Sequence, residues 1–338
     1  MKHIKFAGVC ILLCAVLLVC AGCGRQPQIY TATWFDVFDT VTTVMAAADS
    51  EDAFQQQADA LHRELLHLHR LFDIYHEYDG LSNLKTVNDS AGRAPVAVEP
   101  EILELLADCR RDYESTGGLV NAAMGSVLTL WHDARTAAAE DPDGAALPDP
   151  ELLAEAALHT DFDDVLLDEE SGTVFLTDPH LHLDVGAMAK GWAAGRAAAS
   201  LPEGWLLSLG GNVVATGPKF PDGTPWSVGT QDPDSSGYVA TVPLTRGSLV
   251  TSGDYQRYFT VDGVAYPHII DPATQYPGRL WRSVTVLSGD SALADALSTA
   301  LFLLDREAGQ QLLDRFGAAA LWIAPDGSVL PGADYPVS

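Results

Sequence analysis

Apolar residues recur with helical spacing in several parts of the chain. Between Ser50 and Phe72 they fall three and four positions apart, and Ser50 is a suitable N-cap residue. A second helix is expected to begin at Pro100 and to end before Gly117, because Pro favours the first helical position and Gly the position after the last. Further helices are expected from about Ala189 to Leu201 and from Ala292 to Leu304. The histidines of the first helix lack the spacing of a helical metal pair and are predicted to face solvent: His62, His67 and His69.

Short apolar runs separated by turn residues predict strands and hairpins. They are Val165–Leu167 and Thr173–Leu176 around Ser171-Gly172, Trp205–Leu209 and Val213–Thr216 around Gly210-Gly211, Tyr255–Val261, Ser283–Leu287, and a hairpin around Pro325-Asp326-Gly327. Between Ala134 and Pro150 the chain is rich in Ala, Asp, Pro and Gly, which predicts a loop or a short insertion. Hairpins mixed with helices, without regular strand–helix alternation, indicate an α+β fold with mixed sheets and packed helices.

The N-terminal segment has the features of a secretory signal. Lys2 and Lys5 precede an apolar run from Phe6 to Ala21, which is shorter than the ~20 residues that a membrane-spanning helix needs. The small residues directly before Cys23 resemble the lipobox of bacterial lipoproteins. We therefore expect a signal peptide at 1–22, lipidation of Cys23, a tether at 23–32 and a body outside the cytoplasm, anchored to the membrane by lipid; an uncleaved N-terminal anchor is the alternative.

Composition and charge narrow the classes of partner. The chain has 338 residues, 47% of them hydrophobic, which is enough for a sizeable core. Lys and Arg number 19 against 46 Asp and Glu, a net charge of −27, and no basic cluster stands out, so we expect no nucleic-acid partner. Cys109 is the only cysteine beyond the predicted leader and tether. A disulfide within the body is therefore excluded, and Cys109 is predicted to be a buried hydrophobic residue.

Three clusters carry candidate chemistry. The stretch His182–Gly191 has the form of a strand, a glycine turn and a helix start, where free N–H groups and Lys190 would suit a phosphate, although such turns are also common structural features. Asp295 and Thr299 lie four positions apart on an otherwise apolar helix, and either offer oxygen ligands to Mg²⁺ or satisfy local backbone groups. His268 and Asp271 flank two apolar residues at a strand end, as an acid–base pair or a structural hydrogen bond.

Taken in order, five segments resemble the ApbE family of FAD:protein FMN transferases. They are Gly186–Gly191 after Asp184, Leu209–Asn212, Thr251–Tyr255, His268–Pro272 and Asp295–Ala300. The resemblance extends from about Thr33 to Trp322, so the expected organisation is one flavin transferase domain at 33–325 and a C-terminal tail at 326–338.

The resemblance implies an ApbE-like α+β fold with a central FAD cleft. Mg²⁺ would be held by the Ala187 carbonyl and by the side chains of Asp295 and Thr299. FAD, the substrate, would contact Phe38, Tyr75, Leu119, Val120, Asn121, Asp184, Lys190 and Ile270. The reaction would split the FAD pyrophosphate, join FMN through a phosphoester to a Thr or Ser hydroxyl of an exported acceptor protein, and release AMP. As a hypothesis, His268 is the base and Asp271 positions it or the metal.

Some positions depart from the family pattern. Phe38 stands where many members carry Met, Asn121 where Asp is frequent, and Ala273 and Gln275 where Arg and Gly are usual. Tyr78 is an alternative to Tyr75 as the flavin contact. Two other functions are compatible with the same residues: an Mg²⁺-dependent FAD pyrophosphatase that uses water as acceptor, and a non-catalytic flavin-binding lipoprotein.

Overall fold

The computed structural model describes residues 28–336. The expected signal peptide and Cys23 lie outside the described residues, as does the first half of the expected tether, residues 23–27. No helix within 28–336 is both long and apolar enough to cross a membrane.

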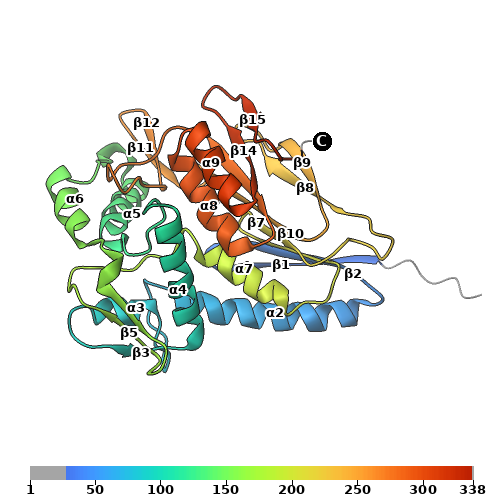
Figure 1. The fold of residues 1–338 in the computed structure, drawn as a ribbon, viewed down its shortest axis with the longest axis horizontal. Helices are drawn as coiled ribbons and strands as arrows, with labels where there is room; N and C mark the ends of the chain where they lie inside the picture. Colours follow the sequence, from blue (N-terminus) through green and yellow to red (C-terminus); the bar gives the residue numbers. More distant parts are fainter. Residues whose placement is uncertain (1–27, 337–338) are drawn as a thin grey trace, which may run out of the picture.

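An eight-stranded antiparallel sheet forms the centre of the molecule (Figure 1). Its spatial order is β1 (Gln28–Val37), β2 (Thr40–Ala48), β6 (Trp205–Leu209), β7 (Asn212–Ala215), β10 (Gly247–Gly253), β13 (Ser283–Ser288), β14 (Ala319–Ile323) and β15 (Val329–Pro331). The two-residue turn between β6 and β7 has positive φ at Gly210 (57°) and Gly211 (94°), which glycine adopts without a steric cost. The expected α+β fold with mixed sheets and helices is confirmed.

Both faces of this sheet are buried, so neighbouring residues of one strand enter different cores. In β6, Leu207 belongs to the main core and Leu206 to a second core. The main core lies against helices, among them α2 (Glu51–Phe72), α7 (Ala189–Ala199) and α8 (Ser291–Leu303), with α9 (Arg306–Phe316) packed beside α8. The second core is closed by the hairpin of β8 (Trp226–Gln231) and β9 (Tyr238–Leu244).

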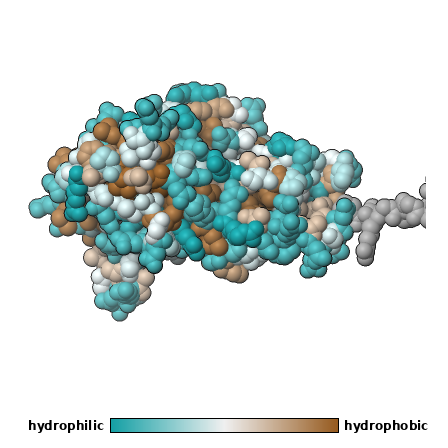
Figure 2. All heavy atoms as spheres, turned by 90° about the horizontal axis from the view of Figure 1, so that it is seen from below, coloured by the Kyte–Doolittle hydropathy of each residue, from teal (hydrophilic) through white to brown (hydrophobic). Residues whose placement is uncertain are grey.

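A smaller sheet and two helices extend one end of the molecule. Strands β3 (Val96–Ala97), β5 (Thr173–Leu176) and β4 (Val165–Asp168) form this sheet beside α3 (Leu84–Asp89) and α4 (Pro100–Ser115). Short 3₁₀ turns at Ala157–His159 and Phe162–Asp164 precede β4, and another at Pro142–Gly144 lies farther upstream in the sequence. On the face seen in Figure 2, hydrophilic side chains predominate and apolar side chains gather in separate patches, as the large excess of acidic residues leads one to expect.

A third core holds together a lobe made from two distant parts of the sequence. It joins α5 (Gly125–Glu140) and α6 (Pro150–Ala156) to the hairpin of β11 (Tyr258–Val261) and β12 (Val264–Pro267). Trp131 of α5 is its centre: its ring packs against Phe259, Tyr266 and Tyr276, and its indole N–H donates to the Gln275 carbonyl at 2.9 Å. We call these elements the α5–hairpin lobe.

The structure differs from two expected boundaries. The expected loop between Ala134 and Pro150 is wrong in its first part, because α5 continues to Glu140. Alanine has the strongest intrinsic helix preference, and the helix-breaking residues begin only at Pro142. The expected boundary at 325/326 falls inside the β14–β15 hairpin, and Tyr335 beyond it is buried in the second core.

Candidate active site

Helices α7 and α8 approach each other most closely at Gly191. Its N–H donates to Oδ2 of Asp295 at 2.7 Å, and Asp295 is only 4% exposed. A Cβ at Gly191 would lie 2.4 Å from the Ser291 carbonyl oxygen and 2.5 Å from Asp295 Cβ. Only glycine therefore allows the carboxylate of one helix to reach the backbone of the other.

This contact leaves three oxygen atoms with unused acceptor capacity. In a regular helix the Gly191 N–H would donate to the Ala187 carbonyl, but it is given to Asp295, and within 28–336 no hydrogen bond to the Ala187 carbonyl is formed. Oδ1 of Asp295 and the half-buried hydroxyl of Thr299 likewise have no hydrogen-bond partner among the described residues. The three residues expected to bind Mg²⁺ thus each offer an unused oxygen.

The chemistry of these donors fits Mg²⁺, which prefers oxygen ligands and takes few carboxylates when substrate phosphates complete its shell. No group of three or more His, Cys, Asp and Glu side chains in the described part of the chain could hold a metal by itself. Burial raises the pKa of Asp295, while the nearby charge of Lys190 and the Gly191 N–H lower it. A cation at the free oxygens would favour the ionised carboxylate further.

The loop before α7 is fixed by hydrogen bonds to distant residues. The side-chain amide of Asn88 donates to the Leu183 carbonyl at 3.0 Å and its oxygen accepts from the Leu183 N–H at 2.7 Å. Asp184 donates its N–H to the Ala122 carbonyl at 2.8 Å, and its carboxylate accepts from the Gly186 N–H. Burial raises the pKa of Asp184, opposed by the Gly186 N–H and by the charges of His132, Lys190 and Arg257. Asp184 thus lies between the free oxygens of Ala187, Asp295 and Thr299 and the 119–125 segment.

The expected flavin contacts on the 119–121 segment differ in exposure. Val120 is buried, and Leu119 is half-buried against the main core. The Asn121 amide group donates to the Thr160 carbonyl at 2.9 Å, and its Oδ1 accepts from the Ala123 N–H at 2.8 Å. The side chain of Asn121 is therefore used to hold the loop, and the segment presents mainly backbone to the site.

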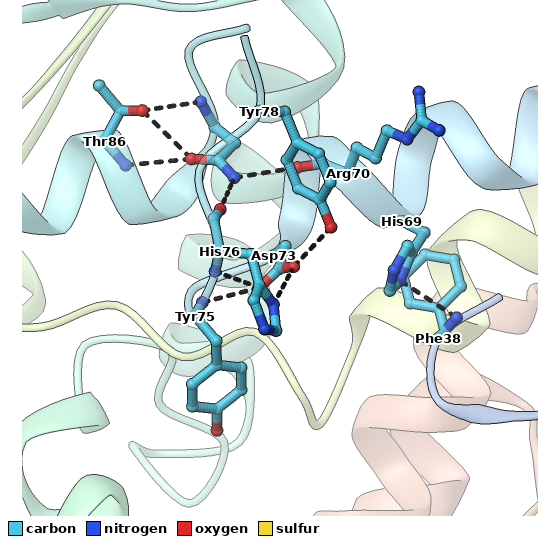
Figure 3. Close-up of polar contacts among 9 residues, drawn as sticks. Phe38, His69, Arg70, Asp73, Tyr75, His76, Tyr78 and Thr86 are labelled. Carbon is cyan, nitrogen blue, oxygen red and sulfur yellow. Dashed lines mark hydrogen bonds and ion pairs between the residues drawn. The ribbon is translucent and has the colours of Figure 1, made fainter. Parts of the chain in front are cut away.

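The structure separates the roles of Tyr75 and Tyr78 (Figure 3). Buried Asp73 accepts hydrogen bonds from the Tyr75 N–H (2.7 Å), the His76 N–H (3.1 Å) and the Tyr78 hydroxyl (2.8 Å). Tyr78 is thus part of the structural network, whereas the ring of Tyr75 points away from it and is 50% exposed. Tyr75 is the tyrosine available to a ligand, and Asp73 positions its backbone.

Phe38 is held at the tight turn between β1 and β2. Its φ is 52°, in the left-handed region, and its N–H donates to Nδ1 of His69 on α2 at 3.1 Å (Figure 3). The two rings pack edge to face at 5.5 Å. The expectation that His69 faces solvent is therefore wrong: this histidine is half-buried and fixes the turn that presents Phe38.

His268 and Asp271 lie in one loop after β12, but no hydrogen bond joins their side chains. The Asp271 carboxylate accepts from the Ala273 N–H at 2.8 Å and shapes the turn at 271–275, while Ile270 packs into the third core. Nδ1 of His268 is buried without a hydrogen-bond partner among residues 28–336. Burial and the neighbouring charges of Lys190, Arg257 and Arg135 lower the pKa of His268 to about 3, so its ring is neutral at physiological pH.

Three residues near His268 were not anticipated from the sequence. His132 and Arg135 come from α5, and Arg257 lies just before β11. Arg135 Nη2 donates to His132 Nδ1 at 3.1 Å, and the ring of His132 stacks on Tyr75 with centroids 4.9 Å apart. Arg135 was overlooked because it lies near the start of the segment interpreted as a loop. Arg257 lies two residues after the matching motif Thr251–Tyr255 and was not part of it.

A groove of about 1010 Å³ lies elsewhere on the surface. It is lined by α4, the second half of α7 and the first turn of α8, including Trp192, Gly195 and Ser291. None of the residues expected to bind flavin or metal lines it. We therefore locate the candidate site by its free oxygens and converging charges rather than by the size of this groove.

Comparisons with known proteins identify the family of this chain. The model of the ApbE family matches residues 38–322. An FAD:protein FMN transferase from Treponema pallidum is 38% identical over 272 residues, covering 75% of this chain and 73% of that protein. Another from Klebsiella pneumoniae is 34% identical over 255 residues, covering 71% and 76%. The crystal structure of the ApbE protein from Thermotoga maritima matches with a TM-score of 0.80 at 30% identity, covering 90% of this chain and 97% of that one.

Proposed function

Because the chain belongs to the ApbE family, we propose that it is an Mg²⁺-dependent FAD:protein FMN transferase, which moves FMN from FAD to a Thr or Ser hydroxyl of an acceptor protein and releases AMP. The observation that carries this proposal is the contact between Gly191 and Asp295. It leaves oxygens of Ala187, Asp295 and Thr299 available beside Lys190, at the start of a helix, where a metal and phosphates are both favoured.

These three residues would hold Mg²⁺, which would supply positive charge to neutralise the charge that develops on the pyrophosphate oxygens. Lys190 lies one position before Gly191, and its ammonium group donates to the Gly186 carbonyl at 3.2 Å. It adds a positive charge beside the free N–H groups at the start of α7. Tyr75 and Phe38, held by Asp73 and His69, supply aromatic surface for the flavin ring.

In this proposal His268 is the base. The acceptor hydroxyl oxygen attacks the phosphorus of the FMN half, the new O–P bond forms, the bond to the AMP oxygen breaks, and His268 takes the hydroxyl proton. Because His268 is neutral and has a nitrogen without a partner, it can accept a proton without first losing one. Asp271 shapes the loop that carries His268 through its bond to Ala273.

We place the enzyme outside the cytoplasm, anchored through a lipid on Cys23, with an exported acceptor protein. The support is the sequence of the first 23 residues: two lysines, an apolar run, and small residues directly before the cysteine. Labelling of cells with a fatty-acid analogue tests this, since wild-type protein would carry the label and Cys23→Ala would not. Equal labelling of both would overturn the lipid anchor.

The function is tested with the purified protein, FAD, Mg²⁺ and peptides bearing candidate acceptor threonines. We expect a gain in acceptor mass that matches FMN and an equal amount of AMP, both lost without Mg²⁺ and in Asp295→Ala. Asp314→Ala is the matched control, because Asp314 is an exposed carboxylate on α9 that bonds only Gln310. AMP formed with every acceptor unmodified would favour a pyrophosphatase, and bound but intact FAD would favour a flavin-binding protein.

A further inference from the structure

The charges of Lys190, Arg135 and Arg257 act on His268, and none of the three forms an ion pair with a carboxylate among the described residues. Lys190 donates only to a backbone carbonyl and Arg135 only to His132, and Arg257 makes no side-chain hydrogen bond or ion pair among the described residues. The Arg257 main chain is joined to the histidine, because its carbonyl accepts from the His268 N–H at 3.1 Å. The charges of Lys190 and Arg257 act on the Asp184 carboxylate, but this carboxylate accepts its hydrogen bond from the Gly186 N–H and none from either guanidinium.

Ion pairing with carboxylates is common but not general among the described arginines. Five of them form such an ion pair within residues 28–336: Arg110, Arg111, Arg196, Arg246 and Arg282. Of the described arginines without one, Arg135 alone is half-buried, whereas Arg257 and the rest are exposed. A group of like charges held together without such partners is unfavourable unless an anion from outside joins it.

Arg135 is held in place rather than free. It is half-buried, and burial and the charge of Arg257 both lower its pKa. His132 links it to Tyr75, whose hydroxyl lies 3.3 Å from the same ring nitrogen that Arg135 contacts. A partly desolvated guanidinium fixed beside an exposed aromatic ring is suited to an anion attached to a planar group, because guanidinium N–H groups match the geometry of phosphate oxygens.

We propose that Arg135 and Arg257, together with Lys190, bind the phosphate oxygens of the flavin nucleotide. This inference rests on the proposed function and adds two residues of the α5–hairpin lobe to it. The lobe would thereby supply positive charge to the phosphates, while Ala187, Asp295 and Thr299 supply the oxygens for the metal. An acidic segment of the acceptor protein is the competing anion, and the experiment separates the two.

The experiment compares binding of FAD and of riboflavin, which lacks phosphate, by flavin fluorescence titration with and without Mg²⁺. We expect Arg135→Gln and Arg257→Gln each to weaken FAD binding about 10- to 100-fold and to leave riboflavin binding unchanged. Arg135→Lys, which keeps the charge, should recover part of the loss. The control is Arg279→Gln in the same lobe, because Arg279 is exposed and lies over the Tyr266 ring at 4.7 Å.

Each outcome decides between the alternatives. A loss specific to FAD supports the proposal, and equal losses for FAD and riboflavin would show a structural effect and overturn it. Unchanged flavin binding with a raised KM for the acceptor would also overturn it and assign the arginines to the acceptor. Failure of the wild-type protein to bind FAD would overturn the proposed function itself. Since Arg257 is exposed, its variant remains informative if Arg135→Gln fails to fold.

Discussion

Replacement of Gly191 by alanine tests the helix contact on which the metal side of the site depends. The added Cβ would lie 2.4 Å from the Ser291 carbonyl oxygen and 2.5 Å from Asp295 Cβ, against an ordinary separation of about 3.5 Å or more. Neither neighbouring atom can rotate away, so α7 and α8 must move apart. Such overpacking costs about 1–3 kcal/mol or more, offset by the roughly 1 kcal/mol that alanine gains over glycine in a helix.

Gly195→Ala provides the matched control on the same helix. Its Cβ would meet only Ser291 Cβ at 3.3 Å, a contact that a small shift relieves, while the gain in helix preference is the same. We therefore expect the two alanine variants to differ by about 2 kcal/mol in the free energy of unfolding, measured by urea denaturation.

Activity should separate the variants as well. At a temperature where both are fully folded, Gly191→Ala should lose most FMN transfer, because the displaced Asp295 no longer lies beside the Ala187 carbonyl, whereas Gly195→Ala should keep it. Equal stability and equal activity of the two variants would refute the inference that Gly191 is required for close approach.

Three further predictions concern residues outside the metal side. Gln275→Gly should raise the free energy of unfolding by about 0.5–1 kcal/mol in urea denaturation, because Gln275 has φ of 60° and glycine adopts this conformation without strain. A lower free energy of unfolding in the variant would contradict this reasoning. Burial, with the charges of Asp108 and Asp290, raises the pKa of Asp112 to about 7. The folded state therefore keeps a proton on Asp112 that the unfolded state releases near pH 4. The free energy of unfolding should consequently fall as the pH rises from 4 to 7. Asp112→Asn should flatten this slope in urea denaturation at pH 5 and 7.5, and an unchanged slope would contradict the assignment. Cys109 is fully buried, which raises its pKa, so a thiol-reactive dye should label it in urea but not in buffer, with Cys109→Ala as the blank.

The helices that the sequence predicts well are those with one buried face. In α2 the periodic positions, such as Phe54 and Leu65, all enter the main core, and Ser50 caps the helix as expected. The β8–β9 hairpin was not predicted although Trp226, Val228 and Thr230 alternate with more exposed residues. This alternating pattern is short, and whether such a segment forms a strand depends on its packing. Here the strand is stabilised because it covers the other face of the main sheet.

Part of the candidate site could likewise be predicted from the sequence, and part of it could not. The resemblance to the ApbE family implied that Ala187, Lys190 and Asp295 belong to one site, whereas their local patterns alone predicted only a helix start and a helix face. The meeting of Arg135 with Arg257 depends instead on how α5 docks on the β11–β12 hairpin, through Trp131 and its aromatic neighbours. Residues so far apart in sequence carry no local pattern that predicts such a contact.

The two sides of the site therefore rest on different cores, and this has an evolutionary consequence. The oxygens of Ala187, Asp295 and Thr299 depend on α7 and α8, whereas His132, Arg135 and Arg257 depend on the α5–hairpin lobe around Trp131. A substitution inside the lobe can shift its cationic groups without disturbing the contact at Gly191. Descendants of one ancestral gene can thus diverge in the ligands that they prefer while inheriting the same proposed metal site, because selection acts on the two cores separately.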